Sequence, residues 1–247
     1  MEVIIINTNE FEEQKPIIID KRDFPFEDVP LSRWLIAMAI LFVGFIIPNI
    51  VEIDNKFFAI GLLFITFILP LFIIDLKFFK KLFKGIKFKD IGIILFTLFL
   101  VFLTAFVTAN LAKDSNLVNN PIEEFISFDN VGVIFLITLV SLMAEEILFV
   151  IPFLFVYNNI GGNRIFKIIM ALLISSIIFG LAHLWTYNFN LIQCLFIIGM
   201  LRIPMSLPYI WRKNLLLTYI VHLAYDWIIL FSILYFLSSG EFIKWKF

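Results

Sequence analysis

The chain contains few of the features on which small soluble enzymes depend. Cysteine occurs once, at Cys194, which excludes an intramolecular disulfide and leaves no CxxC metal or redox motif. Cys194 lies in an apolar run with no histidine near it in sequence, so we expect it to pack rather than to act as a nucleophile. Charged residues make up only 16% of the sequence and the formal net charge is −1, so nothing predicts binding to nucleic acid.

The N-terminal segment does not predict a cleavable signal peptide. Residues 1–33 are mixed and acidic, without the positively charged start and apolar core that such signals have. We expect this segment to be a polar tail that is solvated or lies on the membrane surface.

Apolar residues dominate the rest of the sequence. Hydrophobic residues make up 62% of the 247 positions, phenylalanine occurs 32 times, and the mean hydropathy is +1.01. A soluble domain of this length cannot bury so much apolar surface, so a bilayer is the expected solvent. The long apolar stretches should be helices rather than strands of a barrel, because they are continuous and do not alternate with polar residues. Seven of them lie at about 34–51, 57–75, 91–112, 131–157, 166–187, 189–210 and 214–237.

The distribution of lysine and arginine predicts the orientation. Six lysines crowd the segment 76–90, which should therefore be cytoplasmic. Counting alternate loops from there places fifteen lysines and arginines on the cytoplasmic side, with Arg202 among them, and four on the other side. We therefore predict an all-α polytopic bundle of about seven spans with a cytoplasmic N-terminus, and an eighth, half-buried helix in the tail or in 78–90 as an alternative. Without an internal repeat, 34–247 should form a single transmembrane domain.

Ionisable side chains inside the apolar stretches carry the functional information, because each costs roughly 2.5–3.5 kcal/mol at the centre of a membrane helix. The fourth stretch contains Glu145 and Glu146, the fifth His183, and the seventh His222 and Asp226. The chain has two histidines in all. Since histidine changes its charge near neutral pH and is a frequent metal ligand, this set predicts a functional site rather than packing.

The spacing of these residues groups them on helix faces. His222 and Asp226 are four residues apart, as are Phe179 and His183, so each pair shares a face. Gly180 should permit close approach of another helix.

The two adjacent glutamates point about 100° apart around a helix, so only one can aim at a given partner. We expect Glu145, His183, His222 and Asp226 to converge on one cavity and Glu146 to face a neighbouring helix. His183 lies near the outer end of its stretch, whereas Glu145 and His222 are central. Either a turn buried in the membrane joins the fifth and sixth stretches, or the boundaries differ.

At these residues the sequence resembles the CAAX-protease and bacteriocin-processing (CPBP, Abi) family of intramembrane peptidases. That family carries EExxxR, FxxxH and HxxxN/D on successive parts of its helical core. The motifs read here as Glu145-Glu146 with Val150, Phe179 with His183, and His222 with Asp226. The resemblance covers about residues 130–230 and implies an intramembrane endopeptidase.

By this resemblance, Glu145 and His183 would hold and activate a water that attacks the scissile carbonyl. His222 and Asp226 would stabilise the resulting oxyanion. No cofactor is required by such a mechanism. The implied substrate is a membrane-associated peptide or protein, such as a lipidated C-terminus, a pheromone or a bacteriocin leader, and the implied location is the cell membrane.

One position departs from the family pattern. Val150 stands where the family has the arginine that would pair with Glu146. Glu146 is therefore expected to be protonated, or paired with Arg202 or another helix. Glu146 and Phe179 are assigned supporting roles, and Glu146→Gln is expected to be milder than Glu145→Gln.

Three alternatives follow from the same residues. Glu145, His183 and His222 could ligate zinc with water in the open position, although the usual HExxH motif is absent. The loss of arginine at Val150 fits a non-catalytic family member with a scaffold or immunity role. A proton-coupled transporter could use Glu145 and the histidines as a relay, although no inverted repeat is visible.

Overall fold

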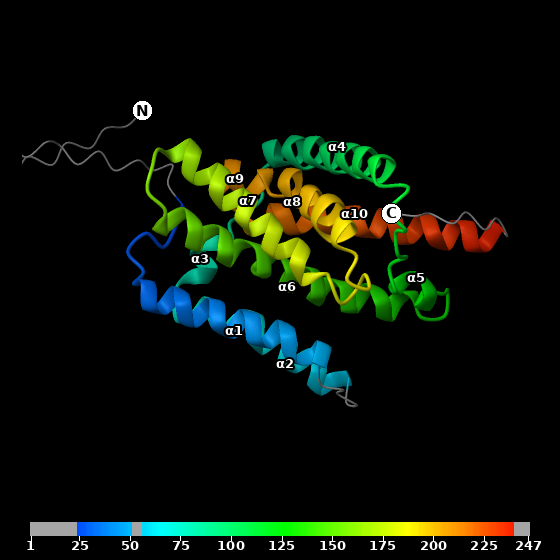
Figure 1. Ribbon diagram of the computed structural model, residues 1–247, viewed down its shortest axis with the longest axis horizontal. Helices are drawn as coiled ribbons and strands as arrows, with labels where there is room; N and C mark the ends of the chain where they lie inside the picture. The colour runs from blue at the N-terminus through cyan, green and yellow to red at the C-terminus, as the bar shows by residue number, and fades with distance from the viewer. Residues whose placement is uncertain (1–23, 51–55, 240–247) are drawn as a thin grey trace, which may run out of the picture.

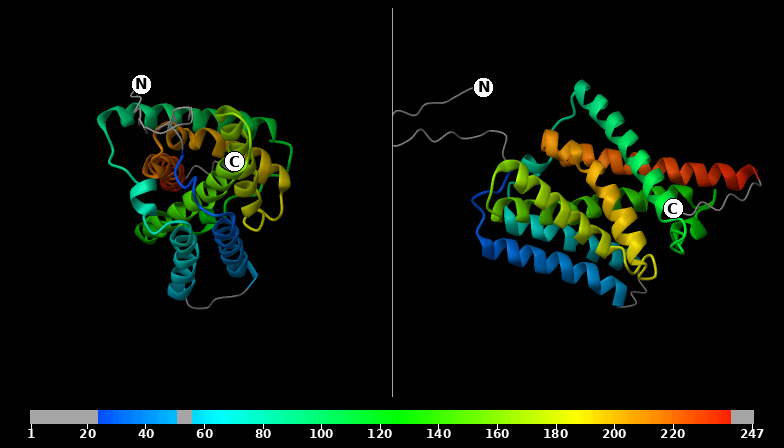
Figure 2. Two further views of the ribbon diagram at one scale, coloured as in Figure 1. Left: turned by 90° about the vertical axis from the view of Figure 1, so that its left-hand side faces the viewer. Right: turned by 45° about the horizontal axis from the view of Figure 1, so that its top comes forward.

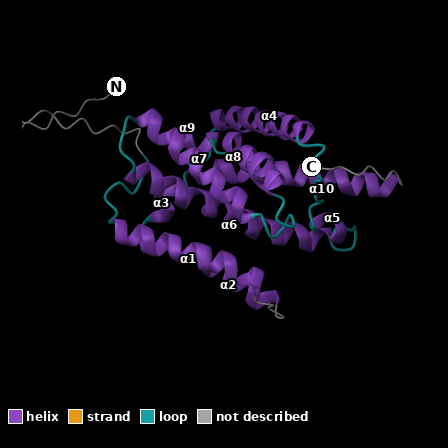
Figure 3. Cartoon of the chain, viewed as in Figure 1, coloured by secondary structure: helices purple, strands orange, loops and turns teal. Residues whose placement is uncertain are grey.

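The computed structural model describes residues 24–50 and 56–239, and these residues form helices joined by short loops (Figures 1 and 3). The elements are α1 (Leu31–Ile50), α2 (Lys56–Ile74), α3 (Phe78–Leu82), α4 (Phe88–Leu111), α5 (Ile122–Phe125), α6 (Val131–Asn159), α7 (Arg164–Ala182), the π-helix η1 (Ile192–Ile198), α8 (Gly199–Met205), α9 (Leu207–Arg212) and α10 (Leu215–Ser239). The predicted fold class, an all-α polytopic bundle, is confirmed.

Each of the seven predicted stretches corresponds to a helix or a run of helices. Five segments of the described chain are long and apolar enough to cross a membrane, namely 88–111, 131–159, 164–182, 192–212 and 215–236. Shorter apolar stretches, Leu31–Ile47 and Ile65–Ile74, lie in α1 and α2. The alternative eighth helix in 78–90 is reduced to α3, which is five residues long.

The central element is α6, which is 29 residues long and contacts α1, α2, α7 and α10. From Glu146 to Leu154 every side chain of α6 is buried. A helix that is apolar on all sides is expected in the middle of a bundle rather than at its surface. The hairpin of α1 and α2 forms a separate projection on one side of α6 (Figure 2).

The predicted polar tail differs in part from the structure. Phe24 is 3% exposed and makes edge-to-face contacts with Phe153 and Tyr157, with ring centroids 5.1 Å and 4.7 Å apart. α1 begins at Leu31, so the end of the predicted tail is packed rather than solvated. Residues 1–23 lie outside the described part of the chain.

The sixth predicted stretch is not one continuous helix but the succession of η1, α8 and α9. Pro208 at the start of α9 has no N–H with which to continue the hydrogen bonds of α8, so the chain turns at Ser206. The N-terminal part packs closely on α7 because Gly180 has no side chain. A Cβ built on Gly180 would lie 2.4 Å from the carbonyl oxygen of Cys194.

Two segments that were both predicted to be cytoplasmic lie side by side at one end of the bundle. The Asn214 side chain accepts a hydrogen bond from the backbone N–H of Lys84 and donates one to its carbonyl, both at 3.0 Å. Arg212 pairs with Asp90 at 2.7 Å. The turn between α9 and α10 is thus held against the chain between α3 and α4, as an alternating topology requires.

Candidate active site

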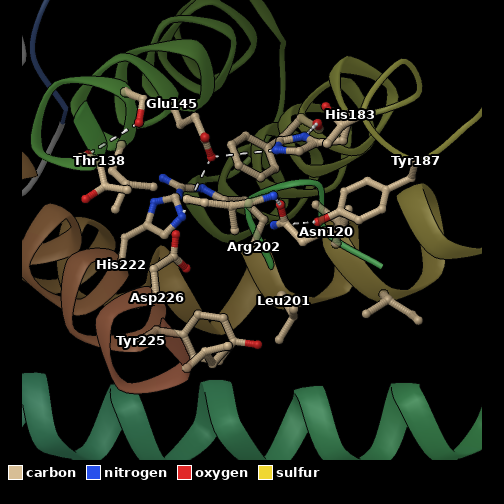
Figure 4. A pocket seen from close by; sticks show the side chains of 18 of the residues that line it. Asn120, Thr138, Glu145, His183, Tyr187, Leu201, Arg202, His222, Tyr225 and Asp226 are labelled. Carbon is tan, nitrogen blue, oxygen red and sulfur yellow. Dashed lines mark hydrogen bonds and ion pairs between the residues drawn. The ribbon is translucent and has the colours of Figure 1, made fainter. Parts of the chain in front are cut away.

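A cavity of about 380 Å³ lies between α4, α6, α7, α8 and α10. The predicted residues Glu145, His183, His222 and Asp226 all line it (Figure 4). Glu146 does not line the cavity and is fully buried against neighbouring helices. The structure therefore brings together the four residues that were expected to converge, and it separates the two adjacent glutamates as the helix geometry requires.

Glu145 lies between the two histidines. Its Oε2 atom is 3.7 Å from Nε2 of His183 and 3.7 Å from Nε2 of His222. These separations are too long for direct hydrogen bonds. The side chain of Glu145 is 29% exposed, so the carboxyl group reaches the space of the cavity while the two rings are more deeply buried.

The end of α7 fixes the orientation of His183. The backbone N–H of His183 bonds to the carbonyl of Gly180 at 3.0 Å, so the last turn tightens and the carbonyl of Phe179 is free to bond elsewhere. That carbonyl lies 2.8 Å from His183 Nδ1. Since a carbonyl only accepts, Nδ1 carries the proton, and Nε2 faces Glu145, where it offers a lone pair when the ring is neutral. Phe179 thus supports the site through its backbone as well as its ring.

Glu146 forms a two-point ion pair with Arg202 of α8. The distances are 2.6 Å from Nη1 to Oε1 and 2.5 Å from Nη2 to Oε2, and both side chains are 0% exposed. This geometry is the strong fork arrangement of guanidinium and carboxylate, and it requires an ionised Glu146. The expected pairing of Glu146 with Arg202 is therefore what the structure shows.

Glu146 also orients the second histidine. Its Oε1 atom lies 2.8 Å from Nδ1 of His222, while Nε2 of the same ring points to Glu145. Asp226 lines the cavity one helical turn further along α10. The Nδ1–H of His222 thus donates the hydrogen bond that fixes the ring to Glu146 rather than to Asp226, the neighbour that shares its helix face.

Arg202 overturns one step of the sequence analysis. It was counted with the cytoplasmic positive charges, but it is 1% exposed in the middle of the bundle. Fourteen rather than fifteen cations therefore remain on that side. Arg202 lies inside the predicted apolar stretch 189–210. That position was the signal of a buried ion pair, because a cation inside a span needs a carboxylate partner.

A cap of polar contacts lies at the end of the bundle opposite to the turn between α9 and α10, and it was not foreseen (Figure 1). Both amide atoms of Gln193 bond to the backbone of Val118 at 2.8 Å. The side chain of Asn120 donates to the Tyr187 hydroxyl at 3.1 Å, and both residues line the cavity. The segment between α4 and α6 is thereby held over the loop that follows α7. Sequence spacing could not reveal these contacts, because the partners are about 70 residues apart.

The geometry of the candidate ligands bears on the metal alternative. Among the described residues, no group of three or more histidine, cysteine, aspartate or glutamate side chains is arranged to hold a metal ion. The outer nitrogens of the rings, Nδ1 of His183 and Nδ1 of His222, are held by a carbonyl and a carboxylate. Zinc binding by Glu145, His183 and His222 stays a prediction.

The fold and the site together define a class: a membrane protein of several spans with a glutamate and two histidines facing one internal cavity. Residues 127–228 match the model of the type II CAAX prenyl endopeptidase Rce1-like family. The membrane-embedded CAAX protease MroQ of Staphylococcus aureus (strain USA300) is 34% identical over 103 residues, which is 41% of this chain and 39% of that relative. No solved structure gives a significant match.

These findings confirm the resemblance drawn from the three motifs. The helical core of this chain is similar to the CAAX-protease and bacteriocin-processing family, and the chain is an integral, multi-pass membrane protein. The matched region contains every residue that the sequence analysis assigned to the site. It spans less than half of the relative's length, so the similarity concerns the core alone.

Proposed function

We propose that this chain is an intramembrane endopeptidase that hydrolyses a peptide bond of a membrane-associated substrate. The observation that carries the proposal is the position of Glu145, whose Oε2 atom is equally far, at 3.7 Å, from Nε2 of His183 and of His222. Atoms at this separation are close enough for one water molecule to bridge them.

In the proposed reaction the water lies about 2.8 Å from Glu145 Oε2 and from His183 Nε2 and donates one hydrogen to each. The two directions then meet at roughly a right angle, which suits the two hydrogens of one water. Both partners accept, because Nδ1 of His183 already donates to the Phe179 carbonyl. The lone pairs of the water are left to attack the scissile carbonyl carbon, while one proton passes to Glu145.

His222 is assigned to the oxyanion that this attack creates. Its Nδ1–H donates to the ionised Glu146, so a second proton on Nε2 makes the ring a cation that lies between the carboxylates of Glu146 and Glu145. The Nε2–H can then donate to the negative oxygen, where one such donor is worth roughly 2.7–4 kcal/mol. Asp226, in its protonated form, is proposed as a second donor.

The tetrahedral intermediate collapses when the carbon–nitrogen bond breaks. The electron pair of that bond goes to the amine nitrogen, which takes the proton that Glu145 received from water. The products are an amine and a carboxylic acid that keeps the second hydrogen of the water, and Glu145 is returned to its ionised form. The acid then loses that proton to solvent and leaves as a carboxylate. One group thus acts first as a base and then as an acid, which requires no further proton donor.

The charge of the cavity favours one kind of substrate. Among the described residues that line it, Glu123, Glu145 and Asp226 are acidic, and Arg202 is the sole lysine or arginine. Both terminal nitrogens of Arg202 are bound to Glu146. A free C-terminal carboxylate close to the scissile bond would meet these acidic side chains and no lysine or arginine outside the ion pair with Glu146, so we propose that the enzyme cuts bonds away from such a carboxylate.

The proposal is tested by comparing membranes that contain the wild-type protein, Glu145→Gln and Glu27→Gln. Glutamine is nearly isosteric with glutamate, and Glu27 is an exposed residue outside the cavity, so it controls for the substitution itself. New peptide N-termini are identified by mass spectrometry, and the cleavage is then repeated with purified protein in lipid nanodiscs. We expect Glu145→Gln to lose roughly 10²–10⁴-fold in kcat. Full activity of Glu145→Gln would end the proposal.

Two further measurements separate the alternatives. Loss of cleavage on chelation, restored by added zinc, would assign a metal to the site. Proton flux through wild-type protein in vesicles without any cleavage would favour a transporter, and absence of both activities in a folded protein would favour a non-catalytic member.

A further inference from the structure

We infer that Arg202 is a positioning residue of the active site, and that a cation placed on α6 at position 150 can take over its role. This inference rests on the proposed function for its kinetic part, while its structural part can be measured on its own. It concerns a residue that touches no reacting atom and acts through Glu146 and His222.

Arg202 is held from several sides. Besides the two bonds to Glu146, its guanidinium lies over the rings of Phe149 and Phe179, with its central carbon 4.4 Å and 4.9 Å from their centroids. Nη1 also approaches the sulfur of Met205 at 3.4 Å. A planar cation between two aromatic faces, with a carboxylate on its edge, is strongly restricted in orientation.

This restriction is passed on to His222 through one oxygen. Oε1 of Glu146 lies 2.6 Å from Arg202 Nη1 and 2.8 Å from His222 Nδ1. The position of that oxygen therefore depends on Arg202, and the direction of the His222 ring depends on the oxygen. The opposite nitrogen of the ring is the one that faces Glu145. Removal of Arg202 should thus misplace the nitrogen that the proposed reaction uses.

Position 150 is where a replacement cation can reach the same carboxylate. Val150 is fully buried on α6, four residues after Glu146, so the two side chains are neighbours on one helix face. Side chains on a helix lean towards its N-terminus, which directs an arginine at 150 back over Glu146. With Arg202 shortened, the space near Glu146 that its guanidinium occupies becomes available.

The experiment uses Arg202→Met alone and together with Val150→Arg, in full-length protein in nanodiscs. Methionine keeps much of the apolar volume of the arginine stem without its charge. We expect Arg202→Met to lose about 10²-fold in kcat with little change in KM, because a small misplacement of a catalytic group costs that much. Adding Val150→Arg should recover most of kcat, whereas Val150→Arg in the wild-type background should lower the unfolding temperature, since it buries a second cation.

Arg212→Met is the matched control. Arg212 pairs with Asp90 at one end of the bundle and does not line the cavity, so its loss should leave kcat unchanged even where it lowers the unfolding temperature. Glu146→Gln added to Arg202→Met should raise the unfolding temperature above that of Arg202→Met alone, because it removes the buried carboxylate that has lost its partner.

Wild-type kcat in Arg202→Met would overturn the inference. So would a Val150→Arg, Arg202→Met protein that regains its unfolding temperature but not its kcat. If that protein does not fold, Arg202→Lys decides: an ammonium keeps the charge without the fork, so kcat should fall between wild type and Arg202→Met, and an unchanged kcat contradicts the inference. The wild type could also cleave nothing while the effects of Glu146→Gln and Arg202→Met on the unfolding temperature remain non-additive. In that case the proposed function fails, but the structural role of the ion pair is supported.

Discussion

Glu145 and His183 approach to 3.7 Å although one lies in the middle of α6 and the other directly follows the last residue of α7. The lengths of the helices explain this. α7 has 19 residues against 29 in α6, so its C-terminal end stops beside the middle of α6 (Figure 1). The loop after α7 then lies inside the bundle, and a helix end supplies the free carbonyl that orients the histidine.

Glu146→Gln should be severe rather than mild. The valine at position 150 suggested that Glu146 lacks a strong partner. In the structure, Glu146 instead pairs with both Arg202 and His222 in a fully buried site. The substitution leaves the Arg202 cation without its counter-charge, and breaking a buried pair in this way typically costs about 3–5 kcal/mol. We expect a clear fall in the unfolding temperature together with a loss of kcat. The buried thiol of Cys194 reports unfolding through a thiol-reactive dye, with Glu27→Gln as the control. An unfolding temperature equal to that of the control would contradict the expectation.

Much of the fold could be predicted from hydropathy alone. Each apolar stretch of about 20 residues must form helix, because backbone groups in lipid have no other partners. The helix faces of the site were also predictable, since four-residue spacing places His222 with Asp226 and Phe179 with His183. These are local properties, and they depend on neither the order of packing nor the tilt of the helices.

The rest of the site depends on contacts between distant parts of the chain. The pairing of Glu146 with Arg202 joins α6 to α8 over 56 positions, and no periodicity specifies it. The depth of His183 depends on where α7 stops relative to α6. The break between α8 and α9 was visible in Pro204 and Pro208, but average hydropathy across the stretch concealed it. Charge counting failed at Arg202 because it treats every cation near a predicted boundary as solvated.

Gly180→Ala should disturb the site from the far side of α7. The added methyl carbon would lie 2.4 Å from the backbone carbonyl of Cys194, and backbone cannot move aside as a flexible side chain can. We expect η1 to shift away from α7, with a lower unfolding temperature and reduced kcat. Gly92→Ala in α4 is the matched control, because nothing lies within 4 Å of its added carbon. Alanine there should be neutral or stabilising by up to about 1 kcal/mol. Equal behaviour of the two variants would show that the close approach is not required.

We expect the orientation of the protein in the membrane to follow the excess of lysine and arginine that remains on one side when Arg202 is left out of the count. Lys84 should lie in the cytoplasm, and Lys113, at the other end of α4, on the opposite side. Cysteines introduced at these two positions are labelled in intact cells with a membrane-impermeant reagent, after which the cells are opened and labelled again. We expect Lys113→Cys to react first and Lys84→Cys only after opening, while the buried Cys194 stays unlabelled. A cysteine at Lys244, beyond the described residues, should behave like that at 113. Labelling of 84 and 113 from the same side would refute seven alternating spans.

The acidic lining of the cavity predicts a preference for peptides without a free carboxylate near the scissile bond, which can be measured as the ratio of two kcat/KM values. Two peptides of the same sequence, one ending in a free carboxylate near the scissile bond and one in an amide, should differ in kcat/KM in favour of the amide. Glu123→Gln should reduce the ratio, because it removes an acidic group at the cavity, whereas Asp129→Asn, in a nearby exposed loop, should leave it unchanged.

The ratio should also depend on pH. Burial raises the pKa of Glu123, so this group becomes neutral as the pH falls through that raised value, while a peptide C-terminus, with a pKa of about 3.5, is still ionised. The preference for the amide should therefore be largest at neutral pH and shrink as the pH is lowered, and in Glu123→Gln this part of the pH dependence should disappear. Because both peptides use the same base, the loss of turnover caused by protonation of Glu145 is common to both and cancels from the ratio. A preference for the free carboxylate at neutral pH would mean that the cavity holds a cation for it, and the assignment of internal bonds as substrates would be wrong.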